Sequence, residues 1–258
     1  MTRLLALTAL PAVLLPACVL AKVGDGQSAT VESSYTGVQA FSLTTFLDTT
    51  VTVTPGGNEA AVSITCDDSL LDQLVADVHD GVLVLEDSAG YALVPRSDCH
   101  AEVDLPTLTA LSNTGAGRLL VTSPASGLTV IDATGSGGVE LVAVTTTDLL
   151  VTHTGSGPVA IGGLDAATVD VTNTGSGGTS LLGRAELATI RVTGSGGFGE
   201  AGFTVDDLVL TLTGSGGAEL TVNHSVDVTL TGTGGATIHG DPPECDVQDT
   251  GTGDVHFE

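Results

Sequence analysis

The sequence is poor in two kinds of side chain, aromatic rings and positive charges. Its 258 residues contain no tryptophan, 2 tyrosines and 5 phenylalanines. Aromatic rings are the usual platforms on which sugars and nucleic-acid bases stack, so the chain has few means of binding either in that way. Lysine and arginine together number 6 against 31 acidic residues, which gives a formal net charge of -25. Such a charge repels nucleic acid and anionic membrane surfaces, and it suits a soluble exported protein or one that meets cationic partners.

Long apolar runs are also scarce, and the clearest one opens the chain. Arg3 followed by the apolar stretch Leu4 to Leu15 is typical of an export signal, and the stretch is too short to span a membrane. Residues 15–18, Leu-Pro-Ala-Cys, resemble the lipobox of bacterial lipoproteins, although proline is unusual in its slot. We therefore expect residues 1–21 to be a lipoprotein-type signal peptide, cleaved before Cys18, whose thiol is then lipidated. Ordinary cleavage after Ala21 is the alternative.

This signal places the protein outside the cytoplasm. We expect a lipoprotein of the outer membrane or the cell surface, or otherwise a periplasmic or secreted protein. Export exposes the remaining cysteines, Cys66, Cys99 and Cys245, to an oxidising compartment. Cys66 and Cys99 lie in one region and are a plausible disulfide pair, whereas Cys245 stands at a position that is aliphatic in equivalent repeats and is expected to be buried. Three cysteines spaced so widely do not make a metal-binding motif, and we expect no metal and no cofactor.

Two segments follow the signal. Residues 22–34 are small and polar, and we expect them to be a tether. Residues 35–105 contain runs such as Thr50 to Thr54 and Ala61 to Cys66, in which apolar and polar residues alternate with a period of two. This alternation predicts strands, so we expect residues 35–105 to be the β-rich N-terminal part of the folded domain.

Residues 106–258 are built from a repeat of about 20 residues. A threonine, a glycine, a small residue and a second glycine recur in that order from Thr114, Thr134, Thr154, Thr174, Thr193, Thr213, Thr231 and Thr250. The residue four positions before the first glycine is aliphatic in every repeat, and the residue after it is polar in every repeat. The slot six positions after that glycine is apolar in every repeat except one, where Glu200 stands. Each repeat therefore holds at least two strands, each with one inward face, joined at a glycine-rich corner.

These features together predict the fold class. A repeat of this length is too short for the longer helix-backed leucine-rich kind, and it matches one rung of a solenoid whose strands stack at about 4.8 Å. Glycines at the corners supply backbone conformations and close approaches that other residues resist. We predict an all-β chain folded as a right-handed parallel β-helix with Gly-Ser-Gly corners. The glycines open no helix and no lysine follows them, so they do not form a phosphate-binding loop.

The succession of motifs resembles a known family, the head (GIN) domain of the "putative autotransporter adhesins". The motifs that carry the resemblance are Gly37-Val38, Val51-Thr-Val-Thr-Pro-Gly-Gly, Leu70-Leu71, Asp80-Gly81-Val-Leu-Val-Leu, Val103-Asp-Leu-Pro106 and the Gly-Ser-Gly rungs. The resemblance covers about residues 31–258. It implies a right-handed β-helix at the envelope or the cell surface. It implies adhesion only through the family's name, and it transfers no catalytic residues.

Ionisable residues that could carry chemistry are scattered. Asp227 and Asp246 occupy the same outward slot on adjacent repeats, so their carboxylates could share a proton or hold a cation. A solvated acidic face is the alternative, and we favour it. Enzymes that cleave uronate polymers also need basic groups for the substrate, but the arginines of the repeats stand at unrelated positions. The six histidines show no metal-ligand spacing, and no serine has a recognisable base partner, so we predict no catalytic residue.

Two classes of function remain. The first is a non-enzymatic, adhesin-like binding or structural module, exported to the envelope or cell surface. Its partners would be the membrane, through a lipid on Cys18, and a surface glycan or an envelope protein. The second is a β-helical carbohydrate-active enzyme of the polysaccharide lyase or hydrolase type. Such an enzyme needs a tight outward cluster of three or more ionisable groups, which the repeats do not show, so we favour the first class. The oligomeric state is left open.

Overall fold

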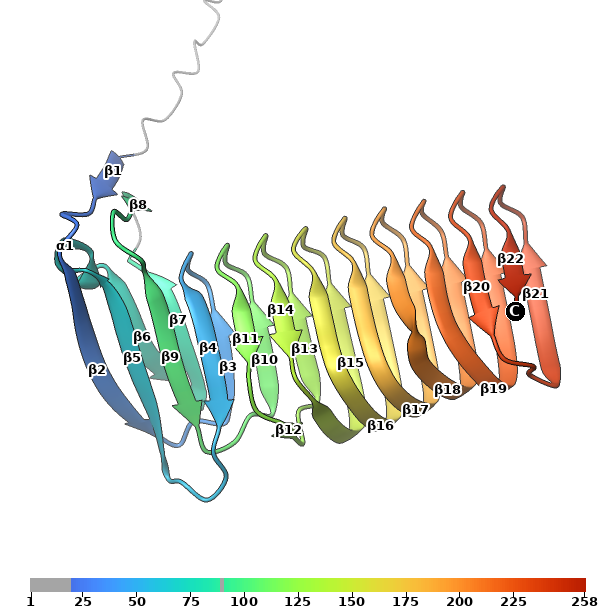
Figure 1. The fold of residues 1–258 in the computed structure, drawn as a ribbon, viewed down its shortest axis with the longest axis horizontal. Coiled ribbons are helices and arrows are strands. Elements are labelled where there is room, and N and C mark those ends of the chain that lie inside the picture. Colours follow the sequence, from blue (N-terminus) through green and yellow to red (C-terminus); the bar gives the residue numbers. More distant parts are fainter. Residues whose placement is uncertain (1–19, 89–90) are drawn as a thin grey trace, which may run out of the picture.

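Strands stacked in register account for almost all of the regular structure in the computed structural model, which describes residues 20–88 and 91–258. Within these ranges the only helix is α1 (Asp68–Leu71), a single turn. The strands are arranged as a rod of successive rungs, with the N-terminal strands at one end and β21 and β22 at the other (Figure 1). The predicted all-β solenoid with rungs about 20 residues apart is confirmed.

Three parallel ladders form the sides of the rod. The first contains β3 (Ala40–Leu43), β10 (Ala110–Asn113), β13 (Val130–Ala133), the final residues of β15 (Val144–His153), β16 (Val159–Asn173), β17 (Thr179–Val192), β18 (Phe198–Leu212) and β19 (Ala218–Leu230), and β21 (Glu244–Asp249). The second contains β4 (Asp48–Val53), β11 (Leu119–Val121), β14 (Val139–Leu141), the first residues of β16 to β19, β20 (Ala236–His239) and β22 (Val255–Phe257). The third begins at β12 (Ala125–Ser126) and continues through the first residues of β15 and the middle of β16 to β19.

Antiparallel strands close the N-terminal end of the rod. In the second ladder β2 (Ser28–Thr36) pairs with β5 (Glu59–Asp67), which pairs with β9 (His100–Leu105) beside β4. In the first ladder β6 (Leu74–His79) pairs with β7 (Val82–Asp87) beside β3. The expectation that residues 22–34 form a tether is therefore wrong for most of that segment. Strand β2 lies mostly exposed along the edge of β5, so it needs backbone hydrogen bonds but few apolar side chains.

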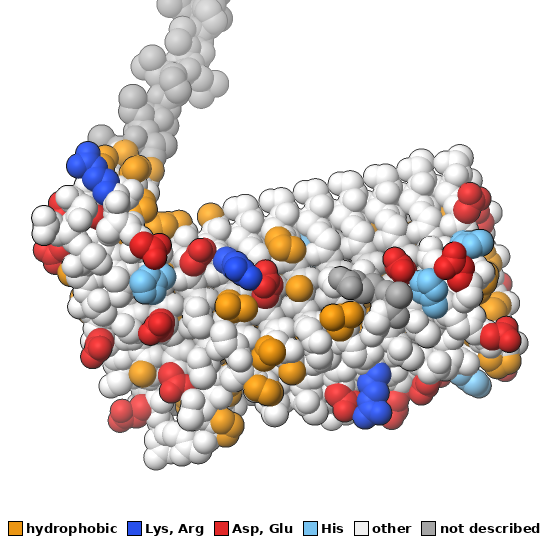
Figure 2. Space-filling view, in the orientation of Figure 1, with side chains coloured by type: hydrophobic (Ala, Val, Ile, Leu, Met, Phe, Trp, Pro, Cys, Tyr) orange, Lys and Arg blue, Asp and Glu red, His pale blue; other side chains and the backbone are white. Residues whose placement is uncertain are grey.

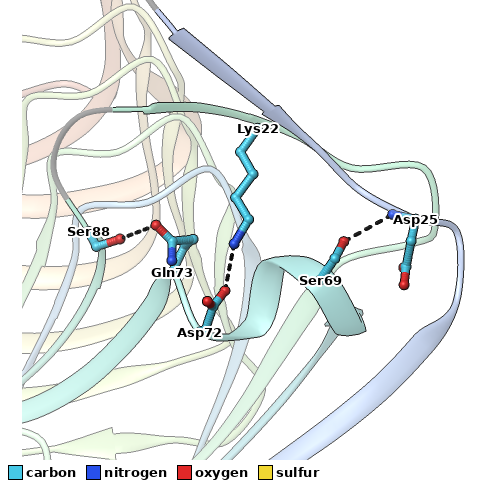
Figure 3. Close-up of polar contacts among 6 residues, drawn as sticks. All are labelled: Lys22, Asp25, Ser69, Asp72, Gln73 and Ser88. Carbon is cyan, nitrogen blue, oxygen red and sulfur yellow. Dashed lines mark hydrogen bonds and ion pairs between the residues drawn. The ribbon is translucent and has the colours of Figure 1, made fainter.

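A small two-stranded ribbon precedes this end of the rod. Strand β1 (Leu20–Val23) pairs in parallel with β8 (Tyr91–Val94). Figure 3 shows how the ribbon is held against α1: the Lys22 ammonium donates to the Asp72 carboxylate over 2.8 Å, and the backbone N–H of Asp25 donates to the Ser69 hydroxyl over 3.1 Å. Residues 1–19, which include Cys18 and most of the predicted signal, lie outside the described residues.

Alternation along each strand fills the interior with aliphatic side chains. On β16, for example, Val169 and Val171 are buried whereas Asp170 is exposed, and the same pattern recurs on the neighbouring rungs. Both columns that the sequence predicted to face inward are buried along the rod: Leu111, Ile131, Val151, Val171, Ile190, Leu210 and Val228 in the first, and Val121, Leu141, Ile161, Leu181, Leu220 and Ile238 in the second. Burying such a side chain contributes about 1.5–3 kcal/mol, so the rod is stabilised rung by rung.

The last rung departs from this pattern. Val247 and Phe257 are each 40% exposed, and Cys245 is a free, exposed cysteine. The expectation that Cys245 is buried is wrong, because the described chain stacks no further rung on β21 and β22. No helix among the described residues has the length and apolar character to cross a membrane.

Candidate functional site

Asp227 and Asp246 lie where the sequence placed them, as register neighbours on β19 and β21. Both side chains are exposed, and together with Asp207, Val209 and Glu244 they border a shallow hollow on the outside of the rod. Within the described chain, neither belongs to a group of three potential metal ligands whose ligating atoms lie within 4.8 Å of one another. The register therefore brings the two carboxylates to adjacent rungs of an acidic face.

A polar contact that the sequence did not reveal lies beside this pair. The Asp207 carboxylate accepts a hydrogen bond from the Ser225 hydroxyl and lies 2.8 Å from Nδ1 of His224. The hydrogen bond from Ser225, and then that from His224, lower the pKa of Asp207, and the carboxylate in turn raises the pKa of His224. Because Ser225 donates to the carboxylate and not to the imidazole, this arrangement lacks the serine-to-histidine contact that activates a nucleophile.

Two of the three arginines in residues 106–258, Arg118 and Arg184, are engaged in ion pairs. Arg118 forms a hydrogen-bonded ion pair with Glu140, and Arg184 pairs with Asp165 over 3.0 Å through two parallel hydrogen bonds. Each pair joins neighbouring rungs, since residues about 20 positions apart lie side by side in a ladder. Both arginines thus link neighbouring rungs, and because these ion pairs are exposed to solvent their contribution to stability is small.

Among the described residues, Cys66, Asp67 and Cys99 are three potential metal ligands whose ligating atoms lie within 4.8 Å of one another. The structure joins Cys66 to Cys99 in a disulfide, so the two thiolates that a metal would require are already consumed. The bridge closes a segment of 33 residues that contains β6, β7 and β8. We interpret it as a cross-link that stabilises the N-terminal end of the rod.

Asp67 is fully buried beside this bridge and organises the loops around it. Its carboxylate accepts backbone hydrogen bonds from Gly26 over 2.6 Å, Arg96 over 2.7 Å and Ser97 over 3.2 Å. Burial by itself would raise the pKa of Asp67, but these hydrogen bonds to the charged form outweigh it and lower the pKa. The carboxylate therefore serves the fold, because it satisfies loop N–H groups.

An inward column of polar side chains lies at the corners. The Asn113 amide donates to the carbonyls of Gly117 and Gly138, and Asn173 makes the equivalent contact with Gly177 over 2.9 Å. Through these bonds the two asparagines satisfy carbonyl groups at the turn. His153 occupies the same column and is fully buried, with Nδ1 2.9 Å from the Thr179 hydroxyl. The column is structural.

Replacing His153 by asparagine, the residue used in two other rungs, should make folding stability less dependent on pH. Burial lowers the pKa of His153, with a hydrogen bond to the Gly157 backbone acting in the opposite sense. As the pH falls below the ordinary histidine pKa of about 6.5, the unfolded chain therefore binds a proton at this residue that the folded chain does not bind. The free energy of unfolding decreases as a result. Thermal melting between pH 7 and about pH 5 should show a smaller decline in the variant. An identical decline in both proteins would contradict this assignment.

The corners also create an elongated surface hollow. Each corner contains two glycines separated by one residue, and the position after them faces outward. On four successive rungs this position is also glycine: Gly178, Gly197, Gly217 and Gly235. These glycines line a hollow that ends at Glu219, Asp254 and His256 near the C-terminal end of the rod. In Figure 2 the ridge formed by the corners is almost free of coloured side chains, because it presents backbone and small residues.

Solved structures share this fold along almost their whole length. One, described as a "putative lipid binding protein" from Parabacteroides distasonis, is 21% identical with a TM-score of 0.81, and the match covers 91% of this chain and 98% of that one. A "putative adhesin" from the same species is 23% identical with a TM-score of 0.81 over 92% and 99% of the two chains. A "putative adhesin" from Parabacteroides merdae is 21% identical with a TM-score of 0.79 over 92% and 98%. No curated protein matches the chain.

The stacked ladders and glycine corners define the protein as a parallel β-solenoid. Identities this low between it and the solved structures show the fold alone. The family is shown by its sequence model, described as "Putative auto-transporter adhesin, head GIN domain", which matches residues 41–242. The chain belongs to this family, and the resemblance noted in the sequence is confirmed.

Proposed function

We propose that the chain is a non-enzymatic, adhesin-like binding module, exported to the cell envelope or surface and held there by a lipid on Cys18. The main support is that the described residues form one continuous rod with long outer faces. The family to which the chain belongs is also named for adhesin heads. Two of its solved structural neighbours are likewise described as a "putative adhesin". A rod of this kind offers extended surfaces, which suit contact with another macromolecule better than the enclosure of a small substrate.

Two features support export and anchoring. The Cys66–Cys99 disulfide fits an oxidising compartment, and the large negative charge fits an exposed soluble surface. Strand β1 begins at Leu20, so a lipid on Cys18 would hold the ribbon of β1 and β8 close to the membrane. Because β21 and β22 stand at the opposite end of the rod, that end would project away from the anchor (Figure 1).

Replacing Cys18 by serine removes the thiol that would carry the lipid. We expect the natural protein in the membrane fraction, released only by detergent, and the variant in the soluble exported fraction with its fold intact. The reason is that each buried CH₂ of an acyl chain contributes about 0.8 kcal/mol to membrane binding. Fractionation followed by immunoblotting measures the change.

Cys245→Ser is the matched control and should leave the membrane fraction unchanged, because the exposed thiol of Cys245 lies at the far end of the rod. Equal membrane retention of the Cys18→Ser variant would argue against the lipid anchor. Accumulation of the natural protein in the cytoplasm would overturn the proposed function as a whole.

A further inference from the structure

Two neighbouring outward columns run along the rod from β15 to β21 and form what we name the acidic strip. The first column is Asp148, Thr168, Leu187, Asp207, Ser225 and Glu244. The second, two residues later on each rung, is Leu150, Asp170, Thr189, Val209, Asp227 and Asp246. Each residue is the register partner of the next in its column, so the strip is continuous over six rungs.

The strip faces outward throughout. Between its two columns, the first five rungs place Leu149, Val169, Ala188, Leu208 and Val226, all of which are buried, whereas the last rung places the exposed Cys245. Since side chains alternate along a strand, the residues on either side of each buried one point away from the core. Two shallow hollows lie along the strip and share Leu187 as a wall, so the surface is grooved.

Its composition differs from an ordinary solvated face. Half of the positions are carboxylates, and neither column contains a lysine or an arginine. Three further positions are large aliphatic residues that remain open to solvent: Leu150 is 43%, Leu187 40% and Val209 38% exposed. These apolar groups would gain free energy if a partner covered them.

Groups of opposite charge border the strip without neutralising it. His224 lies against Asp207, and Arg191 stands one outward column further along β17. The remaining carboxylates of the second column, Asp170, Asp227 and Asp246, have no ion pair with a described basic residue. They are therefore available to a cationic partner.

We propose that the acidic strip binds an extended cationic segment of a partner protein, in which lysines or arginines alternate with apolar residues. The proposal rests on the function proposed above and specifies the partner. Charge complementarity selects this occupant, because a uronate polymer or a second copy of this acidic chain would be repelled. A neutral glycan would leave the carboxylates unpaired and would find no aromatic platform in the strip.

The test uses the mature chain, made soluble by Cys18→Ser, and a fluorescein-labelled peptide of alternating lysine and valine. Fluorescence anisotropy at about 0.15 M ionic strength, where exposed charges are screened beyond about 8 Å, measures binding by the natural strip and by the triple variant Asp170→Asn, Asp227→Asn, Asp246→Asn. We expect the triple variant to bind about tenfold more weakly, as three exposed ion pairs are lost. The variant Leu150→Ser, Leu187→Ser should also weaken binding by several fold, because the apolar contacts are lost.

The matched control removes three exposed acids elsewhere, with Glu59→Gln, Glu86→Gln and Asp98→Asn. It should leave the dissociation constant within about twofold, since charges that far from the peptide are screened by salt. Thermal melting checks that every variant is folded.

Equal weakening by the control triple, or no weakening by the strip triple, would overturn the strip as the binding face. Equal binding of a lysine–serine peptide would overturn the apolar part of the proposal. Tighter binding of a glutamate–valine peptide would overturn the cationic partner. A protein that is displayed on cells but ignores the lysine–valine peptide would refute this inference alone, whereas loss of display would refute the proposed function.

Discussion

Replacing Gly175 by alanine is expected to destabilise the protein by about 3 kcal/mol or more, or to prevent folding. A Cβ added at this position would lie 2.1 Å from the carbonyl oxygen of Gly155 on the preceding rung, with the backbone of Thr154 also within contact distance. The clash is with the backbone of the preceding rung's corner, so no side chain can turn aside to relieve it. To make room, neighbouring rungs would have to separate and lose ladder hydrogen bonds and core contacts.

The same corner provides a matched control. A Cβ at Gly178 would meet only the carbonyl oxygen of Gly197, at 3.9 Å, and other rungs hold Arg118, Pro158 and Asp254 at the equivalent position. Gly178→Ala should therefore change stability by about 0.5 kcal/mol or less. Chemical denaturation of both variants measures the difference. Similar stabilities of the two variants would contradict the account of the corners as backbone-to-backbone contacts.

Much of the fold could be predicted from the sequence because its features repeat from rung to rung. The period of about 20 residues and the period-two alternation report directly on stacking and burial, because every rung repeats the same physical demands. Val171 and Thr172, for instance, show which face of their strand is buried, and the equivalent residues on other rungs show the same alternation. Asn173 follows the outward Thr172 and faces inward, as this alternation requires, and it forms hydrogen bonds with the backbone of the turn.

Features that do not repeat were harder to predict. Strand β2 is an edge strand whose side chains are mostly exposed, so Ser28 to Thr36 carries little of the apolar pattern that marks a strand. Cys245 occupies an aliphatic slot in the alignment but lies on the terminal rung, where nothing described covers it. In both cases the missing information is which neighbours stack on a residue, and this is a property of the ends of the rod.

The candidate site was only partly visible for a related reason. Alignment on the corner glycines placed Asp227 and Asp246 in one column, which the register confirms. The first column of the strip was not singled out, because no two adjacent rungs carry an acid at its positions. The register of the ladders also shifts between β17 and β18 and between β18 and β19. The contact between Asp207 and His224 depends on those shifts, and it could not be read from a fixed spacing.

Cys245 offers a direct test of surface display, because its thiol is free and exposed at the end of the rod opposite β1. The other cysteines would not compete: Cys66 and Cys99 are joined in a disulfide, and Cys18 would be blocked by its lipid. A membrane-impermeant maleimide added to intact cells should therefore label the natural protein nearly completely. Cys245→Ser should remain unlabelled, which shows that the signal comes from this thiol.

The decisive measurement compares this labelling before and after the envelope is made permeable, with a periplasmic protein that carries a free cysteine as the control for leakage. Display on the surface predicts equal labelling of Cys245 in intact and permeabilised cells, while the control is labelled only after permeabilisation. Labelling of Cys245 that appears only after permeabilisation would contradict display on the surface, since a rod confined within the envelope cannot act as a surface adhesin.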